Sequence, residues 1–376
     1  MRPFITIICL LLTVAATAQP DGADLYKQGY QAANAGKYEE ALALYQKLVK
    51  RDSAHGKAWY EIGWCYNELE KYEDGLQAML KAKQLLGDEP EILFEIGYSY
   101  QRTGRPHEAQ QQYEKCIALK ADFAVAHRQL ATIHYEDNRD FAAALKHYKE
   151  HIRYSDPVNV SSLSWFRKAY CEVEAGDLDA ALQSLEHSIA ADNSNIEAWN
   201  EKGFVFFQQG KADEGIAAYQ KSLAIDTLNA PAYKGLGDIY RVLKQETANA
   251  YTHYSKAVML EPSNAINHFS MAWCYNDKNE FEKSVPHLQK AIELNGGEAI
   301  YHAELGYTYY GLQKYDLALA ALDRSLQLEE LSYALYYKGL IHLALRDKKR
   351  SREMLEKLKA MRAPEAEALA KKIGDL

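Results

Sequence analysis

Small and apolar positions recur along this chain with a period of 34 residues. In the ninth period His302, Leu305 and Tyr309 lie at i, i+3 and i+7, the spacing of an amphipathic helix. A fixed period of this length is typical of a solenoid, in which each repeat buries its apolar face against its neighbours. The small residue that opens each apolar turn stands at Gly29, Gly63, Gly97, Ala131, Ala169, Gly203, Gly237, Ala272, Gly306 and Gly339.

A second apolar stripe in each repeat predicts a second helix. In the ninth repeat Ala318, Leu322 and Ser325 form this stripe. Small residues such as Gly306 and Ala318 allow the two backbones to approach closely. Turn signals such as the one at Gly36 end the first helix. The two helices of a repeat are therefore expected to pack antiparallel.

Two stretches and one proline carry a resemblance to a known family. They are Trp59-Tyr60-Glu61-Ile62-Gly63-Trp64-Cys65-Tyr66, Leu305-Gly306-Tyr307-Thr308-Tyr309 and Pro262, which closes the seventh repeat. This pattern resembles the tetratricopeptide repeat. The resemblance implies an all-α, right-handed superhelical solenoid of antiparallel helix pairs. Ten repeats are expected, at 22–55, 56–89, 90–123, 124–157, 162–195, 196–229, 230–264, 265–298, 299–331 and 332–361.

The repeats leave a segment at each end of the chain. Glu365 and Glu367 begin a last helix, and Lys371 and Lys372 end it, which suits the dipole of a capping helix. The expected divisions are a cleaved signal peptide at 1–18, repeats 1–4 at 19–157, repeats 5–10 at 158–361 and a C-terminal capping helix at 362–376.

Three irregularities interrupt the period. The stretch 156–161 lengthens the step from Ala131 to Ala169 to 38 residues, so stacking is expected to loosen there. One extra residue falls at 137–141 and another at 244–249, and both are expected in the turn between paired helices. Tolerated loop insertion is favoured over a functional hinge. The sequence leaves open whether 156–161 is a hinge.

The N-terminal residues have the three parts of a secretory signal peptide. Arg2 supplies positive charge, residues 4–15 form an apolar run, and residues 16–18 form a small-residue cleavage site. The mature chain is expected to begin at Gln19. No later segment has the apolar length of about 20 residues that a membrane-spanning helix requires. We expect an exported protein, soluble in the periplasm or cell envelope, with no transmembrane segment in the mature chain.

Composition and motifs limit the chemistry. With 44 Lys and Arg against 52 Asp and Glu, the formal net charge is −8, which argues against nucleic-acid binding. Cys65, Cys171 and Cys274 occupy one core position in different repeats, and with Cys116 they are interpreted as buried small residues rather than disulfide partners. No catalytic motif is found. We expect neither an enzyme nor a cofactor protein.

Histidines concentrate in the fourth repeat. His147 and His151 are four residues apart on one helix face, which is the spacing of a metal-binding pair. However, His127, His134 and His151 fall at packing positions of the repeat. We therefore expect partly buried imidazoles and no metal site.

A double row of aromatic residues on the first helices is the candidate binding surface. One row directly follows the small residue, and the other stands four residues earlier on the same helix face. The resemblance places this face along a concave groove that holds partner peptides. Asn67, Arg102, Asn200 and Asn276 add polar groups beside the rings. The expected groove residues are Tyr26, Tyr30, Tyr60, Trp64, Phe94, Tyr98, Phe166, Tyr170, Phe204, Phe269, Trp273, Tyr307 and Tyr336.

The aromatic rows predict a binding function of a particular kind. The Lys, Arg and Asn clamp that some family members use for C-terminal carboxylates is replaced by rings in the first three repeats. We expect a non-catalytic scaffold that binds a protein or extended peptide, with Trp64, Tyr98, Phe204 and Trp273 as the best anchors. A periplasmic binder of glycans or peptidoglycan fragments is the alternative, because rings also stack on sugars. Packing between adjacent first helices is the other role open to each ring. Partner identity and self-association stay undetermined.

Overall fold

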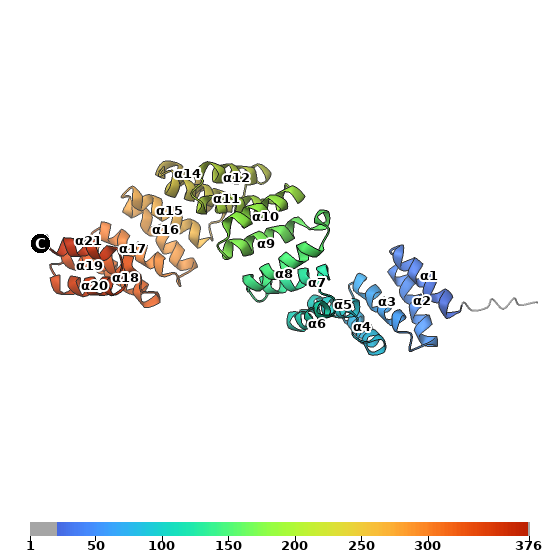
Figure 1. The fold of residues 1–376 in the computed structure, drawn as a ribbon. Helices are drawn as coiled ribbons and strands as arrows, with labels where there is room; N and C mark the ends of the chain where they lie inside the picture. Colours follow the sequence, from blue (N-terminus) through green and yellow to red (C-terminus); the bar gives the residue numbers. More distant parts are fainter. Residues whose placement is uncertain (1–20, 375–376) are drawn as a thin grey trace, which may run out of the picture. The chain divides into compact units, whose positions relative to one another are not determined.

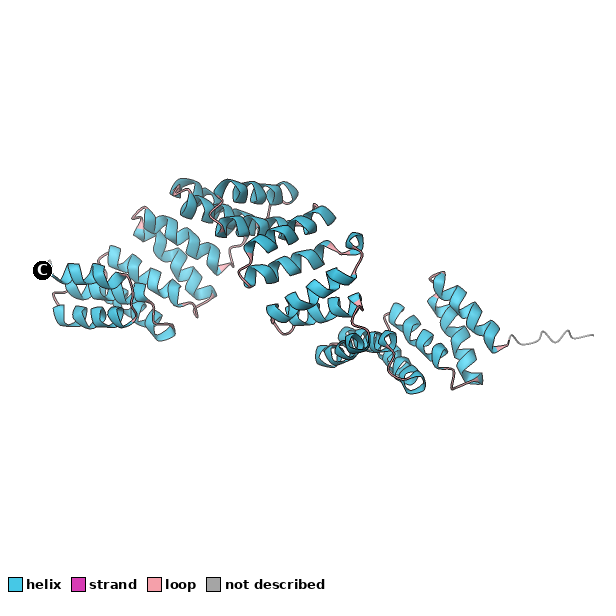
Figure 2. Ribbon diagram, in the orientation of Figure 1, coloured by secondary structure: helices cyan, strands magenta, loops and turns pink. Residues whose placement is uncertain are grey.

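The computed structural model describes residues 21–374, and every regular element within them is a helix (Figures 1 and 2). The predicted signal peptide at 1–18 lies outside the described residues. Contacts divide the chain into two compact blocks, one ending at Val160 and the other beginning at Ser161. We call them the N-terminal block and the C-terminal block.

The N-terminal block holds the first four repeats as helix pairs (Figure 1). Its elements are α1 (Gly22–Asn34), α2 (Tyr38–Arg51), α3 (Gly56–Glu68), α4 (Tyr72–Leu86), α5 (Pro90–Arg102), α6 (Pro106–Leu119), α7 (Ala124–Glu136), α8 (Phe141–Tyr154) and the 3₁₀ helix η1 (Pro157–Asn159).

The C-terminal block holds the other six repeats and a final helix. Its elements are α9 (Ser162–Glu174), α10 (Leu178–Ala191), α11 (Ile196–Gln208), α12 (Ala212–Ile225), α13 (Ala230–Asp238), the π-helical turn η2 (Ile239–Leu243), α14 (Thr247–Leu260), α15 (Ala265–Asp277), α16 (Phe281–Leu294), α17 (Ala299–Gly311), α18 (Tyr315–Leu328), α19 (Ser332–Ala344), α20 (Lys348–Ala360) and α21 (Glu365–Gly374).

Each first helix packs antiparallel on the second helix of its own repeat, and within each block the second helix also contacts the first helix of the next repeat. The prediction of an all-α solenoid of antiparallel helix pairs is therefore confirmed. At the end of the C-terminal block, helix α21 packs on α19 and α20 and buries Leu369 and Ile373. No helix within residues 21–374 is long and apolar enough to cross a membrane.

A contact between a small and a large residue sets the spacing of paired helices. A Cβ atom added to Gly97 on α5 would lie 2.6 Å from the ring of Tyr113 on α6, which is fully buried. The site has no room for a side chain. In the fifth repeat the first helix carries Ala169, and the smaller Leu185 shares its core cluster. The small residue of the 34-residue pattern is therefore a packing requirement.

A left-handed residue precedes every second helix by two positions. Four of these residues are glycines, of which Gly36 has φ 72°, and six are not, of which Arg139 has φ 54°. This geometry ends the first helix and returns its last carbonyls to backbone amides, as in the bond from the Lys37 amide to the Ala32 carbonyl. Backbone bonding therefore permits the turn even where glycine is missing.

The two extra residues in the turns are accommodated differently. In the fourth repeat α7 ends at Glu136 and α8 begins at Phe141, so the extra residue lies in the turn, as predicted. In the seventh repeat that prediction is wrong. The first helix runs on into the π turn η2, which closes with a bond from the Lys244 amide to the Ile239 carbonyl. A π turn holds one more residue than an α turn, so the insertion lies inside the helix.

The four cysteines of the described chain are free and buried, which confirms the interpretation from the sequence. Burial is the main cause that raises the thiol pKa of each to about 12. These thiols stay protonated at neutral pH and serve as small core residues.

Candidate binding surfaces

The thirteen predicted groove residues all lie on first helices, but their exposure differs. Tyr30 on α1 is 51 % exposed and Phe204 on α11 is 37 % exposed. These two rings are the most accessible to a partner. The others are half-buried, and they are Tyr26, Tyr60, Trp64, Phe94, Tyr98, Phe166, Tyr170, Phe269, Trp273, Tyr307 and Tyr336.

Three rings of the later row meet another ring edge to face. In each case the partner is the first residue of the preceding second helix, so the contact joins two repeats. Phe204 differs because the preceding second helix, α10, begins with Leu178. The pairs are Trp64 with Tyr38 (5.5 Å between centroids, 84°), Tyr98 with Tyr72 (6.0 Å, 79°) and Tyr307 with Phe281 (5.8 Å, 87°).

Trp273 is covered by a cation at the place where other repeats have a ring. The guanidinium carbon of Arg241 lies 3.5 Å from the centroid of the Trp273 ring. Arg241 belongs to the π turn η2, and its Nε donates to the Tyr254 hydroxyl at 3.3 Å. A stacked and hydrogen-bonded guanidinium holds the indole in place. Trp273 is therefore less accessible than its position in the repeat suggests.

The earlier row is used mainly for packing. Tyr26 stacks on His55 with 5.5 Å between centroids, and its hydroxyl donates to Glu61 Oε1 at 3.0 Å. One face of the Tyr26 ring is therefore occupied by His55. The other members pack against buried core clusters, and they are Tyr60, Phe94, Phe166, Phe269 and Tyr336.

A polar network that the sequence analysis did not single out lies between the second and third repeats. Asn67 Nδ2 donates to Glu95 Oε2 at 2.8 Å, and Ser99 Oγ donates to Asn67 Oδ1 at 2.9 Å. Burial raises the pKa of Glu95 to about 7, although the bond from Asn67 opposes the shift. The expectation that Asn67 faces the groove is wrong, because this side chain is buried between repeats.

The same network recurs between the eighth and ninth repeats. Asn276 Nδ2 donates to Glu304 Oε1 at 2.7 Å and to Thr308 Oγ1 at 2.9 Å. Burial raises the pKa of Glu304, and hydrogen bonds from Asn276, Trp273 and Tyr333 oppose this rise. Asn276 is therefore also buried and not a groove residue. The sequence signal was the run Trp-Cys-Tyr-Asn, which occurs at both 64–67 and 273–276.

The other two polar residues predicted beside the rings differ in exposure. Arg102 stays exposed, and its guanidinium carbon lies 4.9 Å from the centroid of the Tyr72 ring. Asn200 is half-buried and exchanges amide bonds with Asn229, the N-cap residue of α13. Of these four predicted residues, Arg102 alone offers an exposed polar group next to the aromatic rows.

The histidines of the fourth repeat have structural contacts. His127 Nε2 bonds the Ala121 carbonyl at 2.9 Å, six residues earlier. The Trp59 indole makes the same contact with the Ser53 carbonyl at 3.0 Å. Histidine therefore takes the place of tryptophan at this repeat position. His127 Nδ1 lies 3.1 Å from His147 Nδ1, within hydrogen-bond distance.

His147 and His151, which have the spacing of a metal-binding pair, make separate contacts. His151 Nδ1 bonds the Ala124 carbonyl at 3.1 Å. Burial, followed by the neighbouring His127, lowers the pKa of His147 to about 4, so this imidazole is neutral at pH 7. Within the described part of the chain no group of three or more His, Cys, Asp or Glu side chains is arranged to hold a metal ion.

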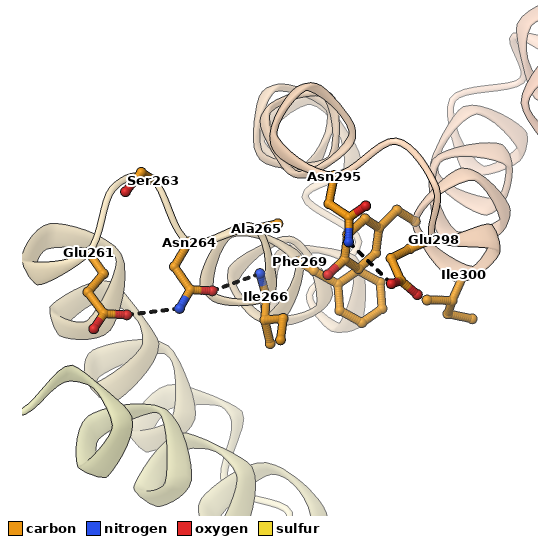
Figure 3. A pocket seen from close by; sticks show the side chains of 10 residues that line it. Glu261, Ser263, Asn264, Ala265, Ile266, Phe269, Asn295, Glu298 and Ile300 are labelled. Atoms are coloured by element: carbon orange, nitrogen blue, oxygen red, sulfur yellow. Dashed lines mark hydrogen bonds between the residues drawn. The ribbon is translucent and has the colours of Figure 1, made fainter. Parts of the chain in front are cut away.

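A pocket of about 800 Å³ lies in the C-terminal block, between the loop before α15 and the loop before α17 (Figure 3). Phe269, Ile266, Ile300 and Tyr301 supply its apolar wall. Figure 3 shows Glu261 and Glu298 on opposite sides of Ile266 and Phe269 in this view. Because Phe269 also contacts Trp273 (5.7 Å between centroids), the pocket adjoins the aromatic row. The remaining lining residues are Ser263, Asn264, Ala265 and Asn295.

The repeat geometry agrees with comparisons to known proteins. Family models described as tetratricopeptide repeat match residues 26–90, 90–123, 271–330 and 303–367, and one described as a tetratricopeptide repeat-like domain matches residues 121–236. The chain belongs to the tetratricopeptide repeat family. The resemblance inferred from the sequence is thereby confirmed.

Curated relatives share only part of this tetratricopeptide repeat array. Superkiller complex protein 3 of Mus musculus is 27 % identical over 131 residues, which cover 34 % of this chain and 8 % of that protein. The peroxisomal targeting signal receptor of Candida albicans is 29 % identical over 102 residues, covering 27 % of this chain and 17 % of the receptor. The chain thus matches less than a fifth of either relative.

Solved tetratricopeptide-like structures share the fold. The crystal structure of the APC/C hetero-tetramer Cut9-Hcn1 matches with a TM-score of 0.52 and 16 % identity, over 94 % of this chain and 90 % of that chain. A structure from the functional characterization of Pseudomonas aeruginosa pilF matches with a TM-score of 0.51 and 16 % identity, over 58 % of this chain and 100 % of that chain. At this identity the likeness concerns the fold alone.

Proposed function

We propose that this tetratricopeptide repeat protein is an exported scaffold, without catalysis of its own, that binds a protein or extended peptide along the aromatic rows of its first helices. One observation carries the proposal. Phe204 is exposed in a row whose other rings, Tyr30 excepted, are half-buried against neighbouring repeats. At 37 % exposure Phe204 offers more of its ring to solvent than the half-buried rings of the row, and aromatic side chains are typical anchors of protein interfaces.

The two exposed rings give the sharpest test. Phe204→Ala and Tyr30→Ala should weaken partner capture, because an anchor ring typically contributes about 2 kcal/mol or more to binding. Matched controls are Leu317→Ala on α18 and Leu80→Ala on α4, which remove exposed apolar side chains from second helices of the same two blocks. Capture is measured by photo-crosslinking in cell-envelope extract and quantitative mass spectrometry, with thermal unfolding recorded for every variant.

The expected result separates the rings from the controls. Partners identified with the unmodified chain should fall by at least about tenfold with Phe204→Ala, which corresponds to about 1.4 kcal/mol. The leucine controls should retain them. If Phe204→Ala and Tyr30→Ala capture the same partners in the same amounts as the controls, the aromatic rows do not bind the partner and the proposal fails.

A glycan ligand is the alternative that the exposed rings also allow, because sugar faces stack on aromatic faces. The same variants are therefore applied to an array of peptidoglycan fragments and other glycans. Retention on the array that Phe204→Ala abolishes, together with no captured protein, would make the ligand a glycan.

Export is the part of the proposal that rests on the sequence alone. The signal-like segment at 1–18 predicts cleavage after Ala18, with Gln19 as the new N-terminus. N-terminal sequencing of protein recovered from the envelope fraction tests this. A chain that keeps Met1 and remains in the cytoplasm would contradict export without affecting the binding proposal.

A further inference from the structure

The pocket beside Phe269 has an acidic rim that no cation of its own neutralises. Of the ten described residues that line it, two are the glutamates Glu261 and Glu298, and none is Lys, Arg or His. Each carboxylate is held by a neighbouring amide: Asn264 Nδ2 donates to Glu261 Oε2 at 2.8 Å, and Asn295 Nδ2 donates to Glu298 Oε1 at 3.2 Å (Figure 3). The amides orient these carboxylates and leave their charge uncompensated.

Between the two carboxylates the wall is apolar and accessible. Ile266 is 52 % exposed and Ile300 is 36 % exposed. Phe269 and Tyr301 lie 4.9 Å apart between ring centroids and form the more buried part of the wall. A long aliphatic stem packs well on such a surface while its charged end stays at the rim.

The helix ends beside the pocket do not reverse this polarity. The N-terminus of α15 carries partial positive charge, but Asn264 Oδ1 already accepts bonds from the Ile266 and Asn267 amides. The N-terminus of α17 follows directly after Glu298. An anionic ligand would therefore have to approach two carboxylates, which disfavours it electrostatically.

We propose that this pocket binds a lysine or arginine side chain of an extended peptide, with an apolar residue of the same peptide packed on Ile266 and Ile300. The inference rests on the proposed function and specifies the partner: a basic-apolar segment. The aliphatic stem of the basic residue lies on Phe269, and its cation lies between Glu261 and Glu298. Because Phe269 lines the pocket and also belongs to the aromatic rows, the pocket adjoins the surface on which the peptide is proposed to lie.

The test uses the full chain and synthetic nonapeptide libraries with one fixed central residue and random flanks. The centre is lysine, arginine, N-acetyl-lysine, leucine or glutamate, and capture is read by mass spectrometry at low salt. Lysine and arginine libraries should be captured about fivefold more than the N-acetyl-lysine library, the ratio expected for one partly exposed ion pair. The preference should fade in high salt, because screening weakens the pair.

The double variant Glu261→Gln with Glu298→Gln should remove this preference, since glutamine keeps the shape and amide contacts but not the charge. Glu282→Gln, an exposed carboxylate on the neighbouring α16, is the matched control and should retain the preference. No preference for basic centres, a preference that survives the double variant, or selection of glutamate centres would overturn the inference.

Two further measurements keep this inference distinct from the proposed function. Phe204→Ala should lower capture of every library alike, whereas the glutamine variants change only the basic preference. If Phe204→Ala lowers capture but basic centres are not preferred, the scaffold function stands and the pocket assignment is rejected. If basic centres are preferred but Phe204→Ala leaves capture unchanged, the aromatic rows are rejected as the binding surface. Sedimentation of the free protein is the other measurement: a dimer that Ile266→Asp dissociates would assign the pocket to a second copy of the chain and overturn the peptide assignment.

Discussion

Replacing Trp64 with alanine distinguishes a ring that packs from a ring that binds. Trp64 is half-buried against two core clusters, and its ring meets Tyr38 edge to face at 5.5 Å. Truncating a fully buried tryptophan costs about 3–5 kcal/mol, so at least about 2 kcal/mol is expected for this largely buried ring. Of this loss about 0.5–1.5 kcal/mol belongs to the contact between the rings, the usual value for an aromatic pair.

The assay has to be local, because an array of repeats opens repeat by repeat. Hydrogen exchange measured by mass spectrometry on the full chain reports opening of α2, α3 and α4 separately. A loss of 2 kcal/mol corresponds to exchange about 30-fold faster at these helices. Combining Trp64→Ala with Tyr38→Ala should cost about 0.5–1.5 kcal/mol less than the sum of the two single changes.

The opposite pattern would refute this reasoning. If the two changes add to within about 0.3 kcal/mol, the rings are not coupled. If Trp64→Ala also leaves exchange unchanged while partner capture falls, Trp64 is an anchor and not a packing residue. Phe204→Ala is the comparison, because its ring lacks an aromatic partner on the preceding helix; it should change exchange less and capture more than Trp64→Ala.

Three further predictions concern stability. Gly97→Ala should lower the thermal midpoint, because overpacking against Tyr113 at about 1–3 kcal/mol outweighs a gain in helix propensity of about 1 kcal/mol; a raised midpoint would contradict this. Glu95→Gln should stabilise the N-terminal block at pH 8 and have little effect at pH 4.5. The folded-state pKa of Glu95, about 7, lies above the ordinary glutamate value of 4.5, so its ionisation destabilises the fold as pH rises; thermal unfolding at both pH values checks the sign. Limited proteolysis should cut first within 156–161, where Val158 is 90 % exposed, and earlier cleavage inside a repeat would show that this stretch is protected.

The sequence by itself determined the repeat, its two helices and its core. These features are local, because the helical period and the size of one residue fix them. Gly97 and Tyr113 illustrate the point: a glycine on one helix and a large ring on the next imply close packing wherever the 34-residue period places them together. The four turns marked by a glycine were equally readable, since each requires only one left-handed residue and a few backbone bonds.

Only the tertiary structure decided which rings are accessible. Trp64 and Phe204 occupy the same position of the repeat, but Tyr38 lies against one and Leu178 begins the helix before the other. Exposure depends on side chains contributed by the preceding repeat, and no pattern within one repeat encodes them. The contact of Arg241, in the π turn, with Trp273 likewise joins two repeats and could not be predicted from one of them.

The buried networks and the acidic pocket also needed the fold. Asn67 and Glu95 are 28 residues apart in sequence and 2.8 Å apart between bonded atoms. Glu261 and Glu298 come from different loops that stacking brings to one pocket. Sequence periodicity predicts which residues each repeat buries. Contacts between repeats decide which side chains stay accessible at the surface, because these contacts join residues that are distant along the chain and become adjacent only after the repeats stack.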